Sequence, residues 1–174
     1  HDPIVGRYVY INCQGKSYRT YYEENGDGIP MVCLHTAGTD GRQYRHQLCD
    51  IDIASNFRVI AFDLPRHGKS IPPEGWHLEE DEYKLTTSFY AEFILEFCRA
   101  LDLNKPVIMG QSMGGNICLE LALRYENEFS ALIAMEACDY SPGWHIDPLH
   151  HPHRHGGEAV ATSVFGLMSP NSPD

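Results

Sequence analysis

The sequence lacks any long hydrophobic run and is poor in positive charge. Nowhere in its 174 residues do the roughly 18–20 consecutive apolar residues of a transmembrane helix occur. The N-terminal stretch HDPIVGRYVY lacks the charged and then apolar build of a signal peptide. Thirteen Lys and Arg against 24 Asp and Glu give a formal charge of −11, which repels nucleic-acid phosphates and anionic membranes. We therefore expect a soluble cytoplasmic protein that binds neither nucleic acid nor membrane.

Closely spaced cysteines are also missing. The chain has no C-x-x-C pair and no dense cysteine framework of the kind that supports small secreted domains. Most of its cysteines fall inside apolar runs, where a reduced cysteine packs as a small hydrophobic residue. This usage favours free thiols and a reducing compartment. The six cysteines are Cys13, Cys33, Cys49, Cys98, Cys118 and Cys138.

The chain does contain the apolar material of one ordinary globular domain. Hydrophobic residues make up 43% and charged residues 21% of the sequence, unlike the composition of disordered chains. Residues 7–12 and 17–24 have strand character and are joined through a turn at Gly15, which predicts a hairpin. Four short, continuously apolar runs follow, a pattern typical of strands buried on both faces of a parallel sheet. These runs cover residues 31–34, 59–62, 107–109 and 131–135.

Helical periodicity separates the apolar runs. Between residues 86 and 103, apolar side chains recur every third or fourth position and form a stripe on one predicted helix. The same spacing follows Gly115, and residues 40–54 predict a less regular helix. Strands that alternate with helices in this way predict an α/β fold, a doubly wound and mostly parallel sheet with helices on both faces.

A G-x-S-x-G motif lies between the third of these apolar runs and the helix after it. In the sequence VIMGQSMGG, residues 107–115, Ser112 is the central residue. A sharp strand-to-helix turn strains the backbone of that residue, and glycines on either side avoid collisions with neighbouring elements. The turn sets Ser112 Oγ beside free N–H groups at the positive end of the helix dipole. A glycine-rich turn in which Ser112 only caps the helix is the alternative.

Together with two further stretches in matching order, this elbow resembles the serine-nucleophile branch of the α/β-hydrolase superfamily. Residues 34–38, LHTAG, resemble the family's His-Gly oxyanion loop, and residues 63–70, DLPRHGKS, resemble its D-x-P-G-H-G-x-S loop. Thr36 and Arg66 depart from the family's pattern, which has glycine at both places, and so put the local loop conformations in question. The resemblance covers about residues 5–140 and implies a sheet of α/β-hydrolase type, incomplete at its C-terminal end.

The resemblance implies that Ser112 is the nucleophile and that the backbone N–H groups of Ala37 and Met113 form the oxyanion hole. His35 is then a loop-orienting residue, because the family's triad runs serine, acid, histidine in chain order. The implied enzyme cleaves a small ester, lactone, thioester or activated C–C bond through an acyl-enzyme, needs no cofactor and has a small acyl compound as its partner. A non-catalytic receptor or interaction protein on the same fold, and an acyltransferase, are the alternatives.

The rest of the triad is not evident. The family's histidine follows its eighth strand, whereas the pattern here reaches about the sixth, so we expect an N-terminal portion that lacks an obvious catalytic histidine and is inactive alone. Glu136, after the last apolar run, is a candidate for the triad acid, and Asp139 is a weaker one.

Beyond residue 140 the composition changes to Pro, His and Gly. We interpret residues 1–140 as the N-terminal part of the hydrolase core and 141–174 as the start of a cap or insertion. Imidazoles at alternate positions near Asp147 could hold zinc, but such loops often bind metal adventitiously, so we predict no metal site. A catalytic base in this segment would be unusual for the family. Its histidines are His145, His150, His151, His153 and His155.

Overall fold

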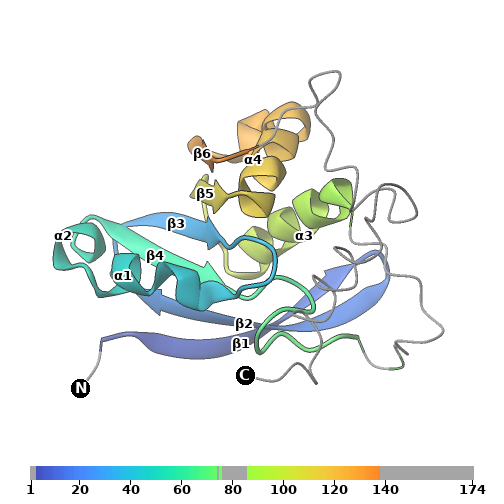
Figure 1. Ribbon diagram of the computed structural model, residues 1–174, viewed down its shortest axis with the longest axis horizontal. Coiled ribbons are helices and arrows are strands. Elements are labelled where there is room, and N and C mark those ends of the chain that lie inside the picture. Colours follow the sequence, from blue (N-terminus) through green and yellow to red (C-terminus); the bar gives the residue numbers. More distant parts are fainter. Residues whose placement is uncertain (1–2, 74, 76–85, 138–174) are drawn as a thin grey trace, which may run out of the picture. The chain divides into compact units, whose positions relative to one another are not determined.

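The computed structural model describes residues 3–73, 75 and 86–137, whose strands form one mixed sheet in the order β1-β2-β4-β3-β5-β6 (Figure 1). The neighbours β4, β3, β5 and β6 are parallel, and an antiparallel hairpin of β1 and β2 extends the sheet beside β4. This confirms the predicted α/β class. The strands are β1 (Val5–Cys13), β2 (Lys16–Asn25), β3 (Ile29–Leu34), β4 (Phe57–Phe62), β5 (Val107–Gln111) and β6 (Ala131–Met135).

A two-residue turn closes the predicted hairpin. Gln14 and Gly15 both adopt positive φ, 50° and 74°, between the paired residues Cys13 and Lys16. Positive φ at both central residues is the geometry of the tight turn that matches the twist of the flanking strands. Gly15 therefore lies in the hairpin turn, as predicted from the sequence.

The helices lie in the connections between strands. Three short segments between β3 and β4 form the less regular helix that was expected: η1 (Gly41–Tyr44), α1 (Arg45–Cys49) and α2 (Ile51–Ala54). The long apolar stripe forms α3 (Thr87–Ala100), and α4 (Met113–Arg124) follows the G-x-S-x-G motif, with η2 (Glu126–Glu128) after it. In the described part of the chain, no helix combines the length and the apolar character that crossing a bilayer requires.

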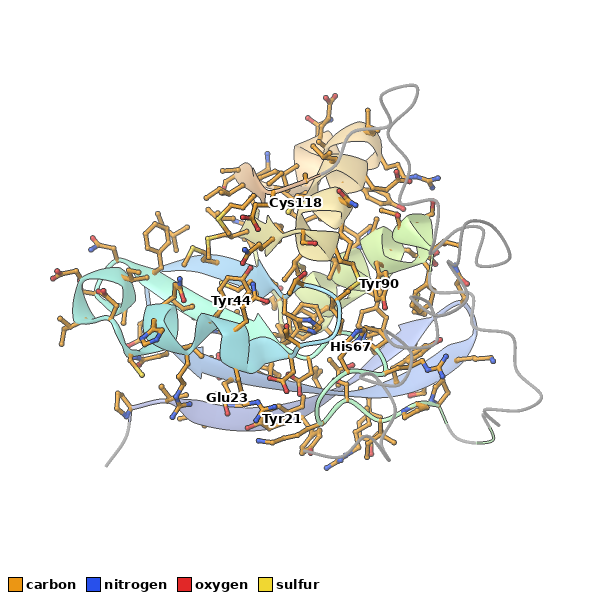
Figure 2. All side chains as sticks on the ribbon, viewed as in Figure 1. Tyr21, Glu23, Tyr44, His67, Tyr90 and Cys118 are labelled. Atoms are coloured by element: carbon orange, nitrogen blue, oxygen red, sulfur yellow. The ribbon has the colours of Figure 1, made fainter. Side chains whose placement is uncertain are left out.

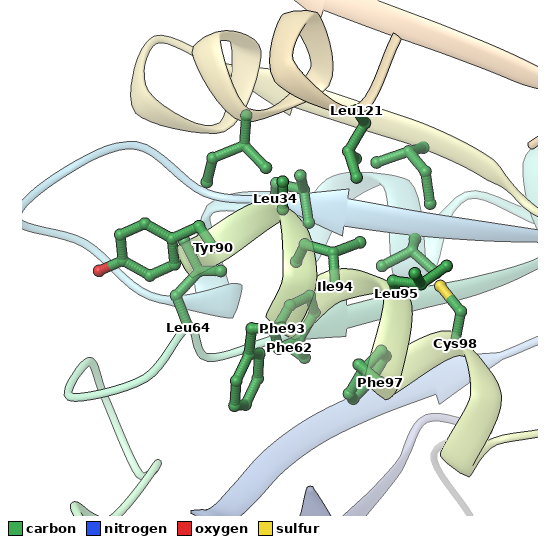
Figure 3. Close-up of a cluster of buried hydrophobic side chains, with 14 of the residues drawn as sticks. Leu34, Phe62, Leu64, Tyr90, Phe93, Ile94, Leu95, Phe97, Cys98 and Leu121 are labelled. Carbon is green, nitrogen blue, oxygen red and sulfur yellow. The ribbon is translucent and has the colours of Figure 1, made fainter. Parts of the chain in front are cut away.

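Both faces of the central strands β3 and β4 are buried, because their alternate residues belong to different cores. Val32 and Leu34 of β3 pack in the larger core with α3 and α4. Figure 3 shows this cluster, in which the ring of Phe62 stacks on that of Phe97 at a centroid distance of 4.2 Å. Helices therefore cover this face, as the doubly wound pattern predicts.

The intervening residues of the same strands face a smaller core. Met31 and Cys33 of β3 pack there with Tyr44 and Leu48. Tyr44 comes from η1 (Figure 2), and its hydroxyl donates a 2.9 Å hydrogen bond to the carbonyl oxygen of Leu34. The alternation of β3 between the two cores explains why its sequence is apolar without a break.

The prediction for β6 needs correction. Its apolar sequence predicts burial on both faces, yet none of its residues is fully buried, and Ile133 is 41% exposed. The reason is its place in the sheet, because among the described strands β6 pairs only with β5. The strand is therefore an edge strand in this part of the chain, with α4 packed against it.

The described cysteines are all free thiols, as their spacing predicts. Cys13, Cys33, Cys98 and Cys118 are buried, and Cys49 is exposed. Cys138 and the expected cap segment 141–174 lie outside the described residues.

Candidate active site

Ser112 lies at the turn from β5 to α4 in a strained backbone conformation. Its φ is 53° and its ψ is −110°, a combination that costs of order 1–3 kcal/mol for a residue with a side chain. Two backbone bonds of 2.9 Å hold it there: the Ser112 N–H donates to Met135 O, and the Asn116 N–H donates to Ser112 O. The side chain is half-buried and does not cap α4. This geometry disfavours the alternative in which Ser112 is only a helix cap.

The glycines beside Ser112 permit close backbone approaches. A Cβ at Gly110 would overlap the carbonyl oxygen of Gly114, and a Cβ at Gly114 would overlap that of Leu34. Leu34 is the last residue of β3 and pairs with Gly110 in the parallel register. The motif's glycines are thus required because the start of α4 lies directly against the end of β3.

The loop that follows β3 begins at a fully buried histidine. His35 Nδ1 donates to Thr36 O at 2.8 Å, and its Nε2 accepts the Leu64 N–H at 3.0 Å. Burial and, after it, the charge of His67 lower its pKa from 6.5 to about 4, so the ring is neutral near pH 7. Since both ring nitrogens are bonded to loop backbone, His35 orients two loops and is not available as a base.

In the loop of residues 63–70, Arg66 stands where the family's pattern has a glycine. Arg66 has a φ of 68°, in the left-handed region that favours glycine. The buried Asp63 holds the loop, because its carboxylate accepts the Gly41 N–H at 2.8 Å and the Lys69 N–H at 2.7 Å. Burial raises the pKa of Asp63 above its usual range. Thr36, the other departure, does not have a positive φ.

The segments that carry Ala37 and Met113 start from neighbouring strands. Ala37 is exposed in the loop after β3, and Met113 is the half-buried first residue of α4. Because β3 and β5 are parallel neighbours, both segments leave the sheet at the same edge. The N-terminus of α4 brings the positive end of its dipole to that edge, where it favours negative charge.

Glu136 lies at this edge as well. It follows β6 with a φ of 49°, and its exposed carboxylate accepts a 2.6 Å hydrogen bond from the side-chain amide of Gln111. Gln111 in turn accepts a 2.7 Å hydrogen bond from Gln43 Nε2. Sequence analysis missed Gln43 and Gln111, because a lone amide side chain carries no motif. The position of Gln111 beside Ser112 was the one available signal.

Asp139, Asp147 and the histidines from His145 to His155 lie outside the described residues. Within residues 3–73, 75 and 86–137, no group of three or more His, Cys, Asp and Glu side chains is arranged to hold a metal ion.

Comparison with known proteins identifies the family. The model of the α/β-hydrolase fold family matches residues 29–156, well over half of the sequence. The chain belongs to the α/β-hydrolase family. The matched range contains the elbow at Ser112, the loop at His35 and the loop at Asp63, so the three stretches that carry the resemblance lie within the family match.

Two curated relatives of this α/β-hydrolase carry hydrolase names. It is 30% identical over 137 residues to epoxide hydrolase 4 of Mus musculus, an alignment that covers 78% of this chain and 36% of the relative. It is 25% identical over 142 residues to 2-hydroxymuconate semialdehyde hydrolase of Pseudomonas sp. (strain CF600), covering 81% and 46%. The chain therefore spans about a third to a half of the length of these relatives.

A solved structure agrees with the fold. The crystal structure of a membrane phospholipase A, a bacterial virulence factor, superposes with a TM-score of 0.69 at 20% identity, covering 88% of this chain and 46% of that one. At this identity the similarity shows the shared architecture of the α/β-hydrolase sheet.

Proposed function

We propose that this α/β-hydrolase cleaves a small ester, lactone, thioester or activated C–C bond through an acyl-enzyme on Ser112. The single observation that carries the proposal is the backbone of Ser112, with a φ of 53° at the turn between β5 and α4. Strain of this kind persists only where the surrounding structure enforces it, and it concentrates at functional sites. The half-buried side chain is not used as a helix cap, which supports a chemical role.

The proposed reaction uses the two amides at the same sheet edge. Ser112 Oγ bonds to the acyl carbon while its proton passes to a histidine base, and the carbonyl oxygen becomes an oxyanion. The N–H groups of Ala37 and Met113 would stabilise that charge, a contribution of about 3 kcal/mol for each well-placed donor. The bond to the leaving group then breaks as the leaving group takes the proton, and water hydrolyses the acyl ester.

In the proposed reaction the histidine base comes from outside the described residues. Of the histidines within them, His46 is exposed on α1. His35 and His67 are buried, and each bonds to a carbonyl oxygen of its own loop, Thr36 O and Pro65 O respectively. A serine hydroxyl is a weak nucleophile without a positioned base. The activity is therefore proposed for the full-length protein. The relatives' names differ in substrate, so the class of acyl compound that is cleaved is a question for experiment.

The test is to replace Ser112 with Ala in the full-length protein and to measure hydrolysis of p-nitrophenyl esters. We expect kcat to fall by about 10³-fold or more, because no acyl-enzyme can form. Exposed Ser130 supplies the matched control, since Ser130→Ala changes the same atom away from the elbow. Unchanged turnover in Ser112→Ala would exclude the proposed nucleophile.

A fluorophosphonate probe and product analysis together separate the two alternatives from this proposal. An activated Ser112 is labelled covalently, whereas a non-catalytic receptor on the same fold is not. An acyltransferase is also labelled, but it transfers the acyl group to an added alcohol in preference to water. Product analysis with and without the alcohol distinguishes the two enzymes.

A further inference from the structure

A chain of hydrogen bonds joins the loop after β3 to the elbow and to the end of β6. Gln43 Oε1 accepts the Thr36 N–H at 2.9 Å, and Gln43 Nε2 donates to Gln111 Oε1 at 2.7 Å. Gln111 Nε2 then donates to Glu136 Oε2 at 2.6 Å. This hydrogen-bond chain consists of two amides and one carboxylate. It connects the loop after β3, the end of β5 and the residue that follows β6.

The ends of this chain fix the orientation of both amides. The backbone N–H of Thr36 can only donate, and the carboxylate of Glu136 can only accept. Gln43 must therefore turn its oxygen to Thr36 and its nitrogen to Gln111, and Gln111 must turn its nitrogen to Glu136. Flipping either amide would oppose two acceptors or two donors. The chain has one arrangement in which every bond is satisfied.

We infer that Gln43 is a positioning residue that sets the oxyanion loop against the elbow. Glu136 is the charged end of the hydrogen-bond chain. This inference rests on the proposed function of Ser112. Thr36 directly precedes Ala37, and Gln111 directly precedes Ser112. One side chain therefore spans the two segments that supply the two proposed oxyanion donors.

The contacts around Gln43 favour such a role. Its Oε1 also lies 3.1 Å from the hydroxyl of Thr39, so the same oxygen holds two points of the loop. Both Gln43 and Gln111 are half-buried, where a hydrogen bond is exchanged less readily for water. Displacing one oxyanion donor typically lowers kcat by about 10²–10³-fold, so the spacing that Gln43 sets has a measurable consequence.

The first variant is Gln43→Glu in the full-length protein. It keeps the length of the side chain and the acceptor for Thr36, but it removes the donor to Gln111. If Gln111 flips to supply a donor, its oxygen then faces the Glu136 carboxylate. We expect kcat for a p-nitrophenyl ester to fall by about 10- to 100-fold, with KM within about threefold of the wild type.

The second variant is Glu136→Gln, which separates the positioning role from that of a triad acid. An amide at 136 can still accept from Gln111, so we expect kcat to fall by no more than about threefold. Loss of the acid in a serine triad lowers kcat by about 10⁴-fold. A loss of that size would assign Glu136 to the triad and overturn this inference.

The double variant Gln43→Glu/Glu136→Gln provides the rescue. The carboxylate at 43 accepts from both Thr36 and a flipped Gln111, and the amide at 136 donates to Gln111. Every bond of the hydrogen-bond chain is then made, with the two bonds of Gln111 reversed. We expect kcat to return to within about threefold of the wild type. A merely structural role for the side-chain volume at position 43 would not produce this recovery.

The controls make each failure distinguishable. Gln14→Glu makes the same chemical change beside another carboxylate, Glu92, and should leave kcat unchanged. If Gln43→Glu does not fold by circular dichroism, Gln43→Met replaces it, with the same expected loss of kcat. Full kcat in the Gln43 variant, or no recovery in the double variant, overturns the inference, whereas turnover in Ser112→Ala overturns the proposed function itself.

Discussion

The backbone N–H of Ser112 donates to the carbonyl oxygen of Met135 over 2.9 Å. Met135 is the last residue of β6 and pairs with Gln111 in the parallel register. The strained turn is therefore held by a neighbouring strand as well as by its own helix. This relationship makes the elbow sensitive to packing changes at its glycines.

We predict that Gly114→Ala destabilises the protein although alanine favours helices. A Cβ at this position overlaps the carbonyl oxygen of Leu34, so β3 and α4 must separate. Overpacking costs about 1–3 kcal/mol, and a collision with backbone belongs to the upper part of this range, above the roughly 1 kcal/mol that alanine gains over glycine in a helix. Urea unfolding measures the difference. Leu123→Ala on the same helix is the control, because Leu123 is 83% exposed and should change stability little.

We predict that stability falls between pH 6.5 and pH 4. Burial lowers the pKa of His35 from 6.5 to about 4, and burial also lowers that of His67. The unfolded chain takes up these protons before the native state does, so stability present above pH 6.5 is lost as the pH falls. For His35 the loss is roughly 3 kcal/mol. Urea unfolding at several pH values measures the slope.

The variant His35→Gln should reduce the slope of the free energy of unfolding against pH. It should also be less stable than the wild type at pH 7. The matched control is His46→Gln, because His46 is exposed on α1, and this variant should keep the wild-type slope. A free energy of unfolding that stays constant from pH 7 to 4.5 would contradict the neutral, buried state assigned to His35.

We predict that position 66 tolerates glycine better than valine. Arg66 has a φ of 68°, which glycine adopts freely and a β-branched residue resists. Arg66→Gly should stay within about 0.5 kcal/mol of the wild type, and Arg66→Val should lose about 1–2 kcal/mol. At exposed Arg7 in β1 the order should reverse, since strands favour valine over glycine. Thermal unfolding of the four variants checks both orders.

We predict that Cys49 reacts with iodoacetamide much faster than the other described cysteines. Cys49 is exposed, whereas Cys13, Cys33, Cys98 and Cys118 are buried. Burial raises the pKa of each of these four thiols to about 12, so little thiolate forms near neutral pH. Peptide mapping by mass spectrometry after brief labelling gives the order. Rapid labelling of Cys33 in the native protein would contradict its position in the core.

The fold could be predicted because its signals are local. The continuous apolar sequence of β3 records burial on both faces, and the G-x-S-x-G spacing records the close approaches at Gly110 and Gly114. The apolar sequence of β6 does not by itself predict its exposure among the described residues, because the same sequence serves a central or an edge strand. Strand order, which decides between them, depends on contacts distant in sequence.

The site could be predicted only where it uses a motif. Ser112 and His35 belong to stretches with fixed spacing, and the structure places both at one edge of the sheet. Gln43 and Gln111 lie 68 positions apart and have no spacing that links them, yet they share a 2.7 Å hydrogen bond. A polar contact between loops depends on how two strand ends align, and this alignment is fixed only by the assembled sheet.

The arrangement of the sheet also bears on the order in which the chain folds. The β1–β2 hairpin closes through two residues and needs no distant partner, so it can form within microseconds. Pairing of Leu34 with Gly110 requires the chain to close on itself across more than seventy residues, an entropically costly and slow event. Ser112 acquires its support from Met135 only once β5 has joined β6. The turn at Ser112 is therefore among the last features to mature, and its strained backbone forms only after the sheet has been assembled from β3 to β6.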